Sequence, residues 1–437
     1  MTTINDFPVE ILDAISNEVA SVSESDLRSW RSTCKLIDNL LTPKVLATIY
    51  INFADWRNTR SLVDLASGRN RVHIFARKLI IRCLAPGTGD LGLPQVQMNA
   101  NPRGSYSYPN QPSGPDVAEA ASAVLKYLHE ALRHFRDLEI VDWCTHGYDI
   151  TGINTPVMDL LHSQEHLRTL FIDMSRGVSS PLPDISQLAG LGHLAFIFPQ
   201  PHIRVPSMFL GAAQAIHNSP ELIFLHIFLQ QSYYTPEESA NIDEMYKQMA
   251  QLQHIHTLML YVPTMASLNR LSVLNNLRSL KDIYIYPEEA HAGMEDLWRL
   301  LKEHNIHLKL ISFNMADMAQ TFPDYLMSYS GAEELILSNY QLHWVDPEAD
   351  VTAIATKFFK ALVERHAATL RVLKLKLFSR KSFATWGRVD RLHYLLKLPA
   401  LTKLEIDLTA DEKLTIMNGT STEYVCPTNY CQNRTRF

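Results

Sequence analysis

The sequence has few cysteines and no long apolar run. Its five cysteines are Cys34, Cys83, Cys144, Cys426 and Cys431, an odd number spread over 437 residues. This usage favours reduced thiols, and with them a cytoplasmic or nuclear protein, over a disulfide framework. No apolar stretch approaches the roughly 18 residues needed to cross a bilayer. The opening MTTINDFPVE also lacks the basic and apolar regions of a signal peptide, so we expect no membrane association.

An excess of basic charge is missing as well. The chain has 46 acidic and 40 basic residues, and its formal net charge is -6. This balance argues against a general nucleic-acid binder. The composition is that of a globular protein, but the length is too great for one compact core. We therefore expect either several domains or one elongated solenoid.

Motifs for catalysis or cofactor binding are incomplete. The glycines of Gly87-Thr-Gly89-Asp-Leu-Gly92 match a dinucleotide fingerprint, but Pro94 and the glycine- and proline-rich run after it prevent the helix that the fingerprint needs. His162 and His166 have the spacing of an inverted zinc-protease motif, yet Leu167 begins a predicted strand, which places His166 in a turn. We predict no catalytic residue, no metal ligand and no cofactor, and therefore not an enzyme.

The first fifty residues predict three or four short helices. Pro8 suits a first helical turn, and apolar residues from Val9 to Val19 fall mainly on one face. Ser23 and Asp26 are spaced as a capping pair before a second helix. So small a unit buries little apolar surface, and its apolar stripes need a partner. That partner is either another protein or the following domain, which these helices would then cap.

The stretch FPVEIL…DLRSWRSTCKLIDNLLTP resembles the F-box pattern. The matching positions are Pro8, Glu10, Ile11, Leu12, Asp26, Leu27, Arg31, Thr33, Cys34, Lys35, Leu40 and Pro43. Phe7 stands where the family has leucine, and Trp30 where a smaller apolar residue is common. The resemblance implies binding to a Skp-type adaptor, which joins a cullin scaffold. The residues expected to contact the adaptor are Phe7, Pro8, Val9, Ile11, Leu12, Ile15, Leu27, Trp30 and Cys34.

From about residue 70 an apolar pattern recurs, in which three anchors are followed by a helix-like segment. The triplets are Phe135/Leu138/Ile140, Leu167/Leu170/Ile172, Leu191/Leu194/Phe196, Leu222/Leu225/Ile227, Ile255/Leu258/Leu260, Leu280/Ile283/Ile285, Ala332/Leu335/Leu337, Leu370/Leu373/Leu375 and Leu401/Leu404/Ile406. A weaker copy runs through Leu308 and Leu310, and Leu79 and Ile81 start the series. Strands that alternate with helices predict a parallel sheet.

This region is similar to the leucine-rich-repeat family, although the usual Asn or Cys after the last anchor is missing. We predict an α/β fold with a small all-α F-box at residues 5–50 and an irregular leucine-rich-repeat-like solenoid at 70–410. A flexible loop is expected at 85–116, and an irregular tail at 418–437. The alternative is an ordinary α/β domain with a doubly wound sheet, because strand–helix alternation is common to both.

The immediate neighbours of the anchors in each strand should line the open face of the sheet, since side chains alternate along a strand. Aromatic and thioether side chains are concentrated there, at Phe171, His226, Phe228, Met259, Tyr261, Tyr284 and Tyr286. We predict that these residues bind a protein substrate. With the F-box resemblance, this implies a substrate-receptor subunit of a ubiquitin ligase. The alternatives are a repeat scaffold unconnected to ubiquitin, and a face that is covered by a helix or by the C-terminal tail.

Overall fold

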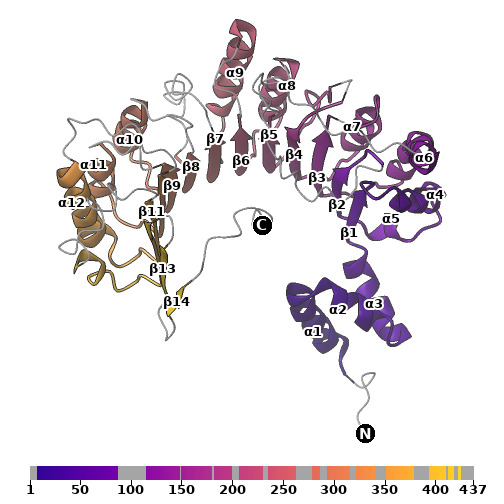
Figure 1. Cartoon of the computed structure of the whole chain (residues 1–437), viewed down its shortest axis with the longest axis horizontal. Helices are drawn as coiled ribbons and strands as arrows, with labels where there is room; N and C mark the ends of the chain where they lie inside the picture. Colours follow the sequence, from indigo (N-terminus) through magenta and orange to yellow (C-terminus); the bar gives the residue numbers. More distant parts are fainter. Residues whose placement is uncertain are drawn as a thin grey trace. The chain divides into compact units, whose positions relative to one another are not determined.

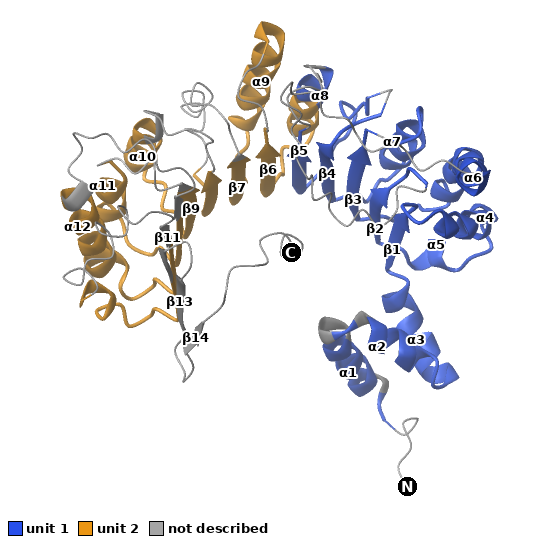
Figure 2. Ribbon diagram, in the orientation of Figure 1, with its two compact units in different colours: residues 1–211 blue, residues 212–437 orange. Residues whose placement is uncertain are grey.

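The computed structural model describes most of the chain. The described residues are 7–86, 115–147, 149–179, 182–198, 206–229, 235–261, 278–285, 293–314, 321–339, 351–377, 393–409, 412–417 and 422–424. The chain divides into two compact units, residues 1–211 and 212–437 (Figure 2). The expected loop at 85–116 lies outside the described residues, apart from Ala85, Pro86 and the start of a helix at Pro115.

The first unit begins with three helices and continues into a parallel sheet. Its elements are α1 (Val9–Val22), α2 (Glu24–Arg31), α3 (Lys35–Val45), β1 (Thr48–Asn52), η2 (Trp56–Thr59), α4 (Arg60–Ala66), α5 (Val72–Phe75), β2 (Lys78–Cys83), α6 (Pro115–Leu132), β3 (Ile140–His146), α7 (Asn154–His162), β4 (Thr169–Arg176) and β5 (His193–Ile197). Helix α8 (Pro206–His217) contains the boundary between the units. Strands β1 to β5 pair in sequence order, all of them parallel.

The second unit repeats the strand–helix alternation. Its elements are β6 (Phe224–Phe228), α9 (Pro236–Met249), β7 (Thr257–Tyr261), β8 (Asp282–Ile285), α10 (Gly293–Glu303), β9 (Leu310–Asn314), α11 (Thr321–Met327), β10 (Glu334–Asn339), α12 (Val351–Ala361), the π-helical turn η5 (Leu362–His366), β11 (Val372–Leu377), β12 (Lys403–Thr409), β13 (Glu412–Met417) and β14 (Thr422–Tyr424). Strands β6 to β12 are parallel, and β13 and β14 are antiparallel.

The repeat anchors form the core of both units. In the first unit Leu79, Val141, Leu170 and Leu194 are neighbours on four adjacent strands, and each is 0% exposed. In the second unit the corresponding neighbours on adjacent strands are Leu225, Leu258, Ile283, Ile311, Leu335, Leu373 and Leu404, all of them buried except Leu404, which is half-buried. Helices cover one side of the strands in each unit (Figure 1). The chain is therefore an α/β protein with N-terminal helices and a leucine-rich-repeat-like parallel solenoid, as predicted.

Two of the predicted repeats are displaced along the sequence. Val141 pairs with Leu170 and Trp143 with Ile172, so the triplet of this repeat is Leu138/Val141/Trp143. Ile140 therefore lies on the opposite face of the sheet from the position that we predicted, because neighbouring residues of a strand alternate between faces. The weak copy is displaced in the same way, since Ile311 and Phe313 are buried anchors and Leu310 is not.

The C-terminal region contains more regular structure than expected. The predicted irregular tail begins at residue 418, but Thr422–Tyr424 forms β14, which pairs with β13 in antiparallel orientation. Strand β13 pairs in the same orientation with β12. The last parallel strand of the second unit is therefore followed by an antiparallel one, which continues the pairing of the sheet by a tighter connection than a helical crossover allows.

Candidate protein-binding surfaces

The three N-terminal helices have a small core of their own. Its buried residues are Leu12, Leu27, Ile37, Leu41 and Val45, and Val19, Trp30, Cys34, Leu40 and Leu46 pack against it. Helix α2 begins where predicted, because the Ser23 side chain accepts a hydrogen bond from the Asp26 amide at 3.2 Å. Helices α1 and α2 each contribute one buried residue to this core, and α3 contributes three. The helices therefore pack together without burying all of their apolar residues.

A single lysine ties α1 to α3. The Lys44 ammonium lies 2.8 Å from a carboxylate oxygen of Asp13 and donates to Asn17 Oδ1 at 2.6 Å. It also donates to Ser16 Oγ and, at 3.3 Å, to the Asp13 carbonyl. Charged hydrogen bonds of this kind are stronger than neutral ones. They fix the face of α1 that points toward α3 and leave another face of α1 outside the core.

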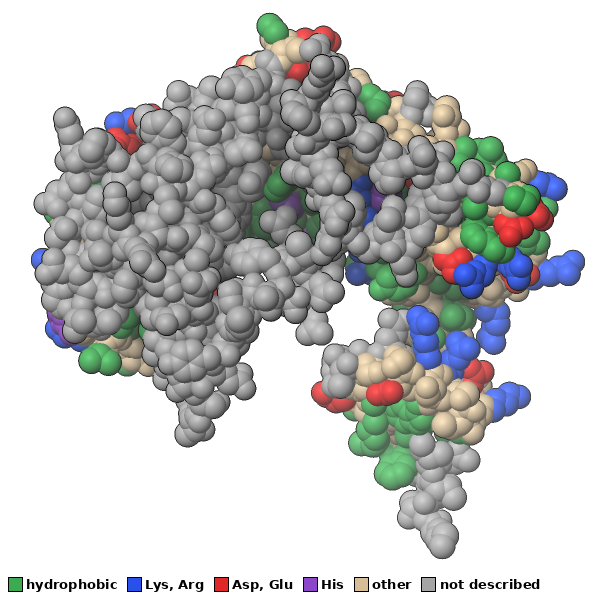
Figure 3. All heavy atoms as spheres, in the orientation of Figure 1, with side chains coloured by type: hydrophobic (Ala, Val, Ile, Leu, Met, Phe, Trp, Pro, Cys, Tyr) green, Lys and Arg blue, Asp and Glu red, His purple; other side chains and the backbone are tan. Residues whose placement is uncertain are grey.

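That other face of α1 is apolar and exposed. On α1, Ile11 is 46% exposed and Ile15 is 43% exposed, one helical turn apart. Phe7, which precedes the helix by two residues, is 45% exposed. Leu36 at the start of α3 is 37% exposed. Figure 3 shows hydrophobic side chains gathered on the underside of the N-terminal helices. We call Phe7, Ile11 and Ile15 the α1 stripe.

The predicted adaptor-binding residues therefore divide into two groups. Phe7, Pro8, Ile11 and Ile15 are exposed, whereas Leu12 and Leu27 are only 1% and 2% exposed and belong to the small core. Trp30 and Cys34 are half-buried against the same core, and the side chain of Val9 lies outside what the structure describes. The sequence prediction did not include Leu36, although the i,i+4 pair Leu36/Leu40 placed it on an apolar helix face.

The predicted substrate-binding residues are brought together only in part. His226, Met259 and Tyr284 are register neighbours on β6, β7 and β8, and each is half-buried. Phe228 lies beside Tyr261 in the same pairing, but the Tyr261 side chain and all of Tyr286 lie outside the described residues. Phe171 is on β4 in the first unit, next to Asp142 and Ala195, and is also half-buried.

The carboxyl end of β2 and β3 holds a group of titratable side chains. Arg82 donates two hydrogen bonds to the Asp142 carboxylate, at 2.7 and 3.0 Å. The Asp149 carboxylate accepts the amides of His146 at 2.8 Å and of Leu84 at 3.2 Å. Burial raises the pKa of Asp149 to about 7. Asp149 therefore links the last residue of β3 to the residue that follows β2 through their backbone amides.

Cys144 and His146 in this group do not form a nucleophile and base. The Cys144 sulfur lies 3.8 Å from His146 Nε2, but that nitrogen is 2.8 Å from the Arg82 carbonyl oxygen. Burial raises the pKa of the Cys144 thiol to about 12, so the thiol stays protonated at neutral pH. Burial also lowers the pKa of His146.

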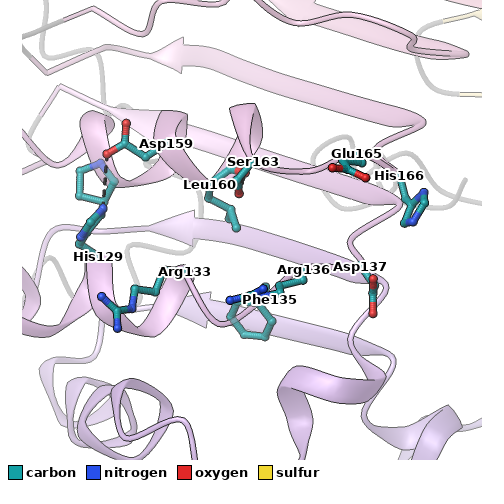
Figure 4. Close-up of a pocket in the computed structure, with 11 residues that line it drawn as sticks. His129, Arg133, Phe135, Arg136, Asp137, Asp159, Leu160, Ser163, Glu165 and His166 are labelled. Atoms are coloured by element: carbon teal, nitrogen blue, oxygen red, sulfur yellow. Dashed lines mark hydrogen bonds and ion pairs between the residues drawn. The ribbon is translucent and has the colours of Figure 1, made fainter.

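A groove of about 480 Å³ lies between α6 and α7. Figure 4 shows His129 and Asp159 facing one another across it, with Glu165 and His166 at the far end. The His129–Asp159 distance is 3.4 Å, and Arg133 pairs with Glu130 at 2.9 Å. Basic side chains (Arg133, Arg136) and acidic side chains (Asp137, Asp159, Glu165) both line the groove. Its lining therefore has no dominant sign of charge, and we assign no ligand to it.

The zinc-protease motif, which the sequence argues against, does not assemble in the described residues. Helix α7 ends at His162, and His166 lies in the turn before β4, as predicted. The two histidines are therefore not on one helix, as the zinc-protease motif would require. The glycines of the dinucleotide fingerprint lie outside the described residues. Within the described part of the chain there is no group of three metal-ligating side chains, and no helix is long and apolar enough to span a bilayer.

Comparison with known proteins adds no family. No family model matches the chain, and no curated protein is similar to it in sequence. Among solved structures it is similar to a chain in the glycosylated Toll–Spatzle complex of Drosophila. The TM-score is 0.32 and the identity 11%, over 83% of this chain and 50% of that one. The chain thus spans half the length of that chain.

Proposed function

We propose that this chain is a non-catalytic substrate receptor of an SCF-type ubiquitin ligase. Helices α1 to α3 would be an F-box that binds a Skp-type adaptor, and the adaptor would join a cullin scaffold. The repeats would bind a protein substrate on the open face of the sheet. The receptor would do no covalent chemistry and would raise the local concentration of the substrate near the loaded conjugating enzyme.

The observation that carries the proposal is the exposed α1 stripe. The N-terminal helices complete a small core and still leave Phe7, Ile11 and Ile15 more than two-fifths exposed. Adjacent exposed apolar side chains of this size are a marker of a protein-binding surface. The same stretch carries the F-box resemblance, and this selects a Skp-type adaptor as the partner.

The test is adaptor capture by variants of the full chain. Ile11→Asp with Ile15→Asp removes two anchors of the stripe without touching the core residues Leu12 and Leu27. Truncation of a well-buried interface anchor often costs about 2 kcal/mol or more, so we expect the double variant to lose co-purification with adaptor and cullin. Leu125→Asp is the matched control, because Leu125 on α6 is 56% exposed and lies away from the stripe.

The two possible outcomes separate the proposal from its rival. Loss of the adaptor in the stripe variant alone supports the F-box. If the stripe variant captures adaptor and cullin as well as the wild type does, the F-box proposal is wrong. The chain would then be a leucine-rich-repeat-like protein-binding scaffold unconnected to ubiquitin, which the fold alone supports equally well.

A further inference from the structure

The segment that follows the N-terminal helices has an unusual charge. Residues 56–78 contain six basic side chains and one acidic one, a net charge of +5, in a chain whose net charge is -6. The basic residues are Arg57, Arg60, Arg69, Arg71, Arg77 and Lys78. Arg57 lies on η2 and Arg60 on α4, Arg69 and Arg71 lie between α4 and α5, and Arg77 and Lys78 lie between the end of α5 and the first residue of β2. Figure 3 shows Lys and Arg side chains gathered on this part of the first unit.

Several of these charges are exposed and only weakly neutralised. Arg60, Arg69 and Arg71 are exposed, and none of them forms an ion pair with a described residue. Arg57 is paired with Asp55 at 3.3 Å, but its side chain is 70% exposed. Among the described residues, two carboxylates lie near Arg77, those of Asp137 and Glu139, each at 3.7 Å. The segment therefore presents net positive charge to solvent.

Aromatic rings hold some of these guanidinium groups in position. The Arg57 and Arg60 guanidinium carbons lie 5.9 and 5.8 Å from the centre of the Trp56 ring. Arg71 lies 5.9 Å from the centre of the Phe75 ring. A guanidinium group near an aromatic ring loses less freedom on binding, and its N–H edge stays available for a carboxylate.

Exposed apolar residues lie in the same segment. Val63 on α4 is 48% exposed, and Ile74 on α5 is 62% exposed. Arginine and aromatic side chains are enriched at protein interfaces, whereas lysine is depleted, and five of the six basic residues here are arginine. The combination of fixed arginines and exposed aliphatic groups fits a protein ligand better than it fits a simple ion.

We propose that the surface of η2, α4 and α5 binds an acidic peptide segment of a partner protein. Carboxylates of the segment would pair with Arg57, Arg60 and Arg71, and its apolar side chains would contact Val63 and Ile74. This surface is distinct from the α1 stripe and from the open face of the sheet. Its existence does not depend on the F-box.

The experiment uses the full chain and a short labelled peptide of alternating Glu and Leu. The Gln/Leu peptide, a single-stranded RNA and phosphatidylserine vesicles serve as comparison probes. We expect the wild type to bind the Glu/Leu peptide with an affinity that falls as salt rises, because exposed charges are screened. Arg57→Glu with Arg60→Glu should weaken that binding by about tenfold or more, while adaptor capture is unchanged.

Two further variants make the outcome specific. Arg299→Glu with Lys302→Glu on α10 reverses two exposed charges elsewhere and should leave peptide binding unchanged. Arg57→Lys with Arg60→Lys keeps the charge but removes the planar guanidinium, so it should give an intermediate loss. The proposal is wrong if the α10 variant weakens peptide binding as much as the Arg57→Glu/Arg60→Glu variant does. It is also wrong if the wild type binds the Gln/Leu peptide as tightly as the Glu/Leu peptide, or binds RNA or vesicles more tightly.

Discussion

Protonation of His366 should destabilise the second unit. The His366 ring is 0% exposed in η5. Its Nδ1 accepts the Ala332 amide at 3.1 Å, which leaves the proton on Nε2, 3.0 Å from the Leu326 carbonyl oxygen. A second proton would have to sit on Nδ1 and would break the hydrogen bond from Ala332. Burial lowers the pKa of His366 from 6.5 to about 4.

The lowered pKa makes the contribution of His366 to the free energy of unfolding depend on pH. Because the folded-state pKa is lower than the unfolded one, the stabilising contribution is complete above pH 6.5 and is lost as the pH falls toward about 4. The full difference corresponds to about 3 kcal/mol, at about 1.4 kcal/mol for each tenfold change in proton affinity. Between pH 7 and pH 5 the expected loss is about 2 kcal/mol.

The assay compares the wild type with His366→Gln, whose side chain does not titrate. Hydrogen exchange of the peptide that contains Ala332 reports the local opening free energy without assuming that the two units unfold together. At pH 7 the local opening free energy of the wild type should be higher than that of His366→Gln. The difference between the two opening free energies should be about 2 kcal/mol smaller at pH 5. His307→Gln controls for loss of an imidazole, because His307 is exposed and stacks on Tyr329. If this difference in opening free energy stays constant or increases on acidification, protonation of His366 does not destabilise the second unit.

Two other predictions concern the first unit and the open face of the sheet. The pKa of Asp149 is raised by burial from 3.8 to about 7, so its stabilising contribution is present below pH 3.8 and is lost as the pH rises through about 7. Relative to Asp149→Asn, the wild type should therefore lose about 2 kcal/mol or more of local stability between pH 5 and pH 8, measured by hydrogen exchange of β3. On the open face, Met259→Ala with Tyr284→Ala should reduce substrate capture and leave adaptor capture intact. A large fall in the melting temperature would instead show that these half-buried side chains are needed for packing.

The repeat pattern could be predicted because its anchor residues all lie in the same kind of environment, the buried face of the sheet. Leu225, Leu258 and Ile283 are apolar, buried and adjacent, and such positions reveal themselves by spacing alone. The predicted anchors were wrong at β3, because the apolar residues there fit two different strand registers. These residues are Leu138, Ile140, Val141 and Trp143. Only pairing with β4 decides between the two registers, since Val141 and Trp143 lie beside Leu170 and Ile172.

The edges of the sheet were harder to predict. Strand β1 has only five residues and begins soon after α3, so its apolar residues looked like a continuation of the helices. A helix after the Leu222/Leu225/Ile227 triplet was expected, but its bounds were not predicted, although Thr235 and Glu238 form a complete capping box at the start of α9 and have the spacing that reveals it. Short elements contain too few apolar residues for the periodicity of a strand or a helix to be recognised in the sequence.

The division of α1 into a core face and an exposed face could not be read from its pattern. Ile11 and Leu12 are neighbours in sequence and equally apolar, yet Leu12 is 1% exposed and Ile11 46%. The reason is that three short helices enclose only a small core, which Leu12 fills together with Leu27 and Leu41. The apolar surface of α1 is wider than this core can cover. The excess, at Phe7, Ile11 and Ile15, is what an isolated module of this size cannot bury by itself, and it is therefore the surface on which the proposed adaptor would bind.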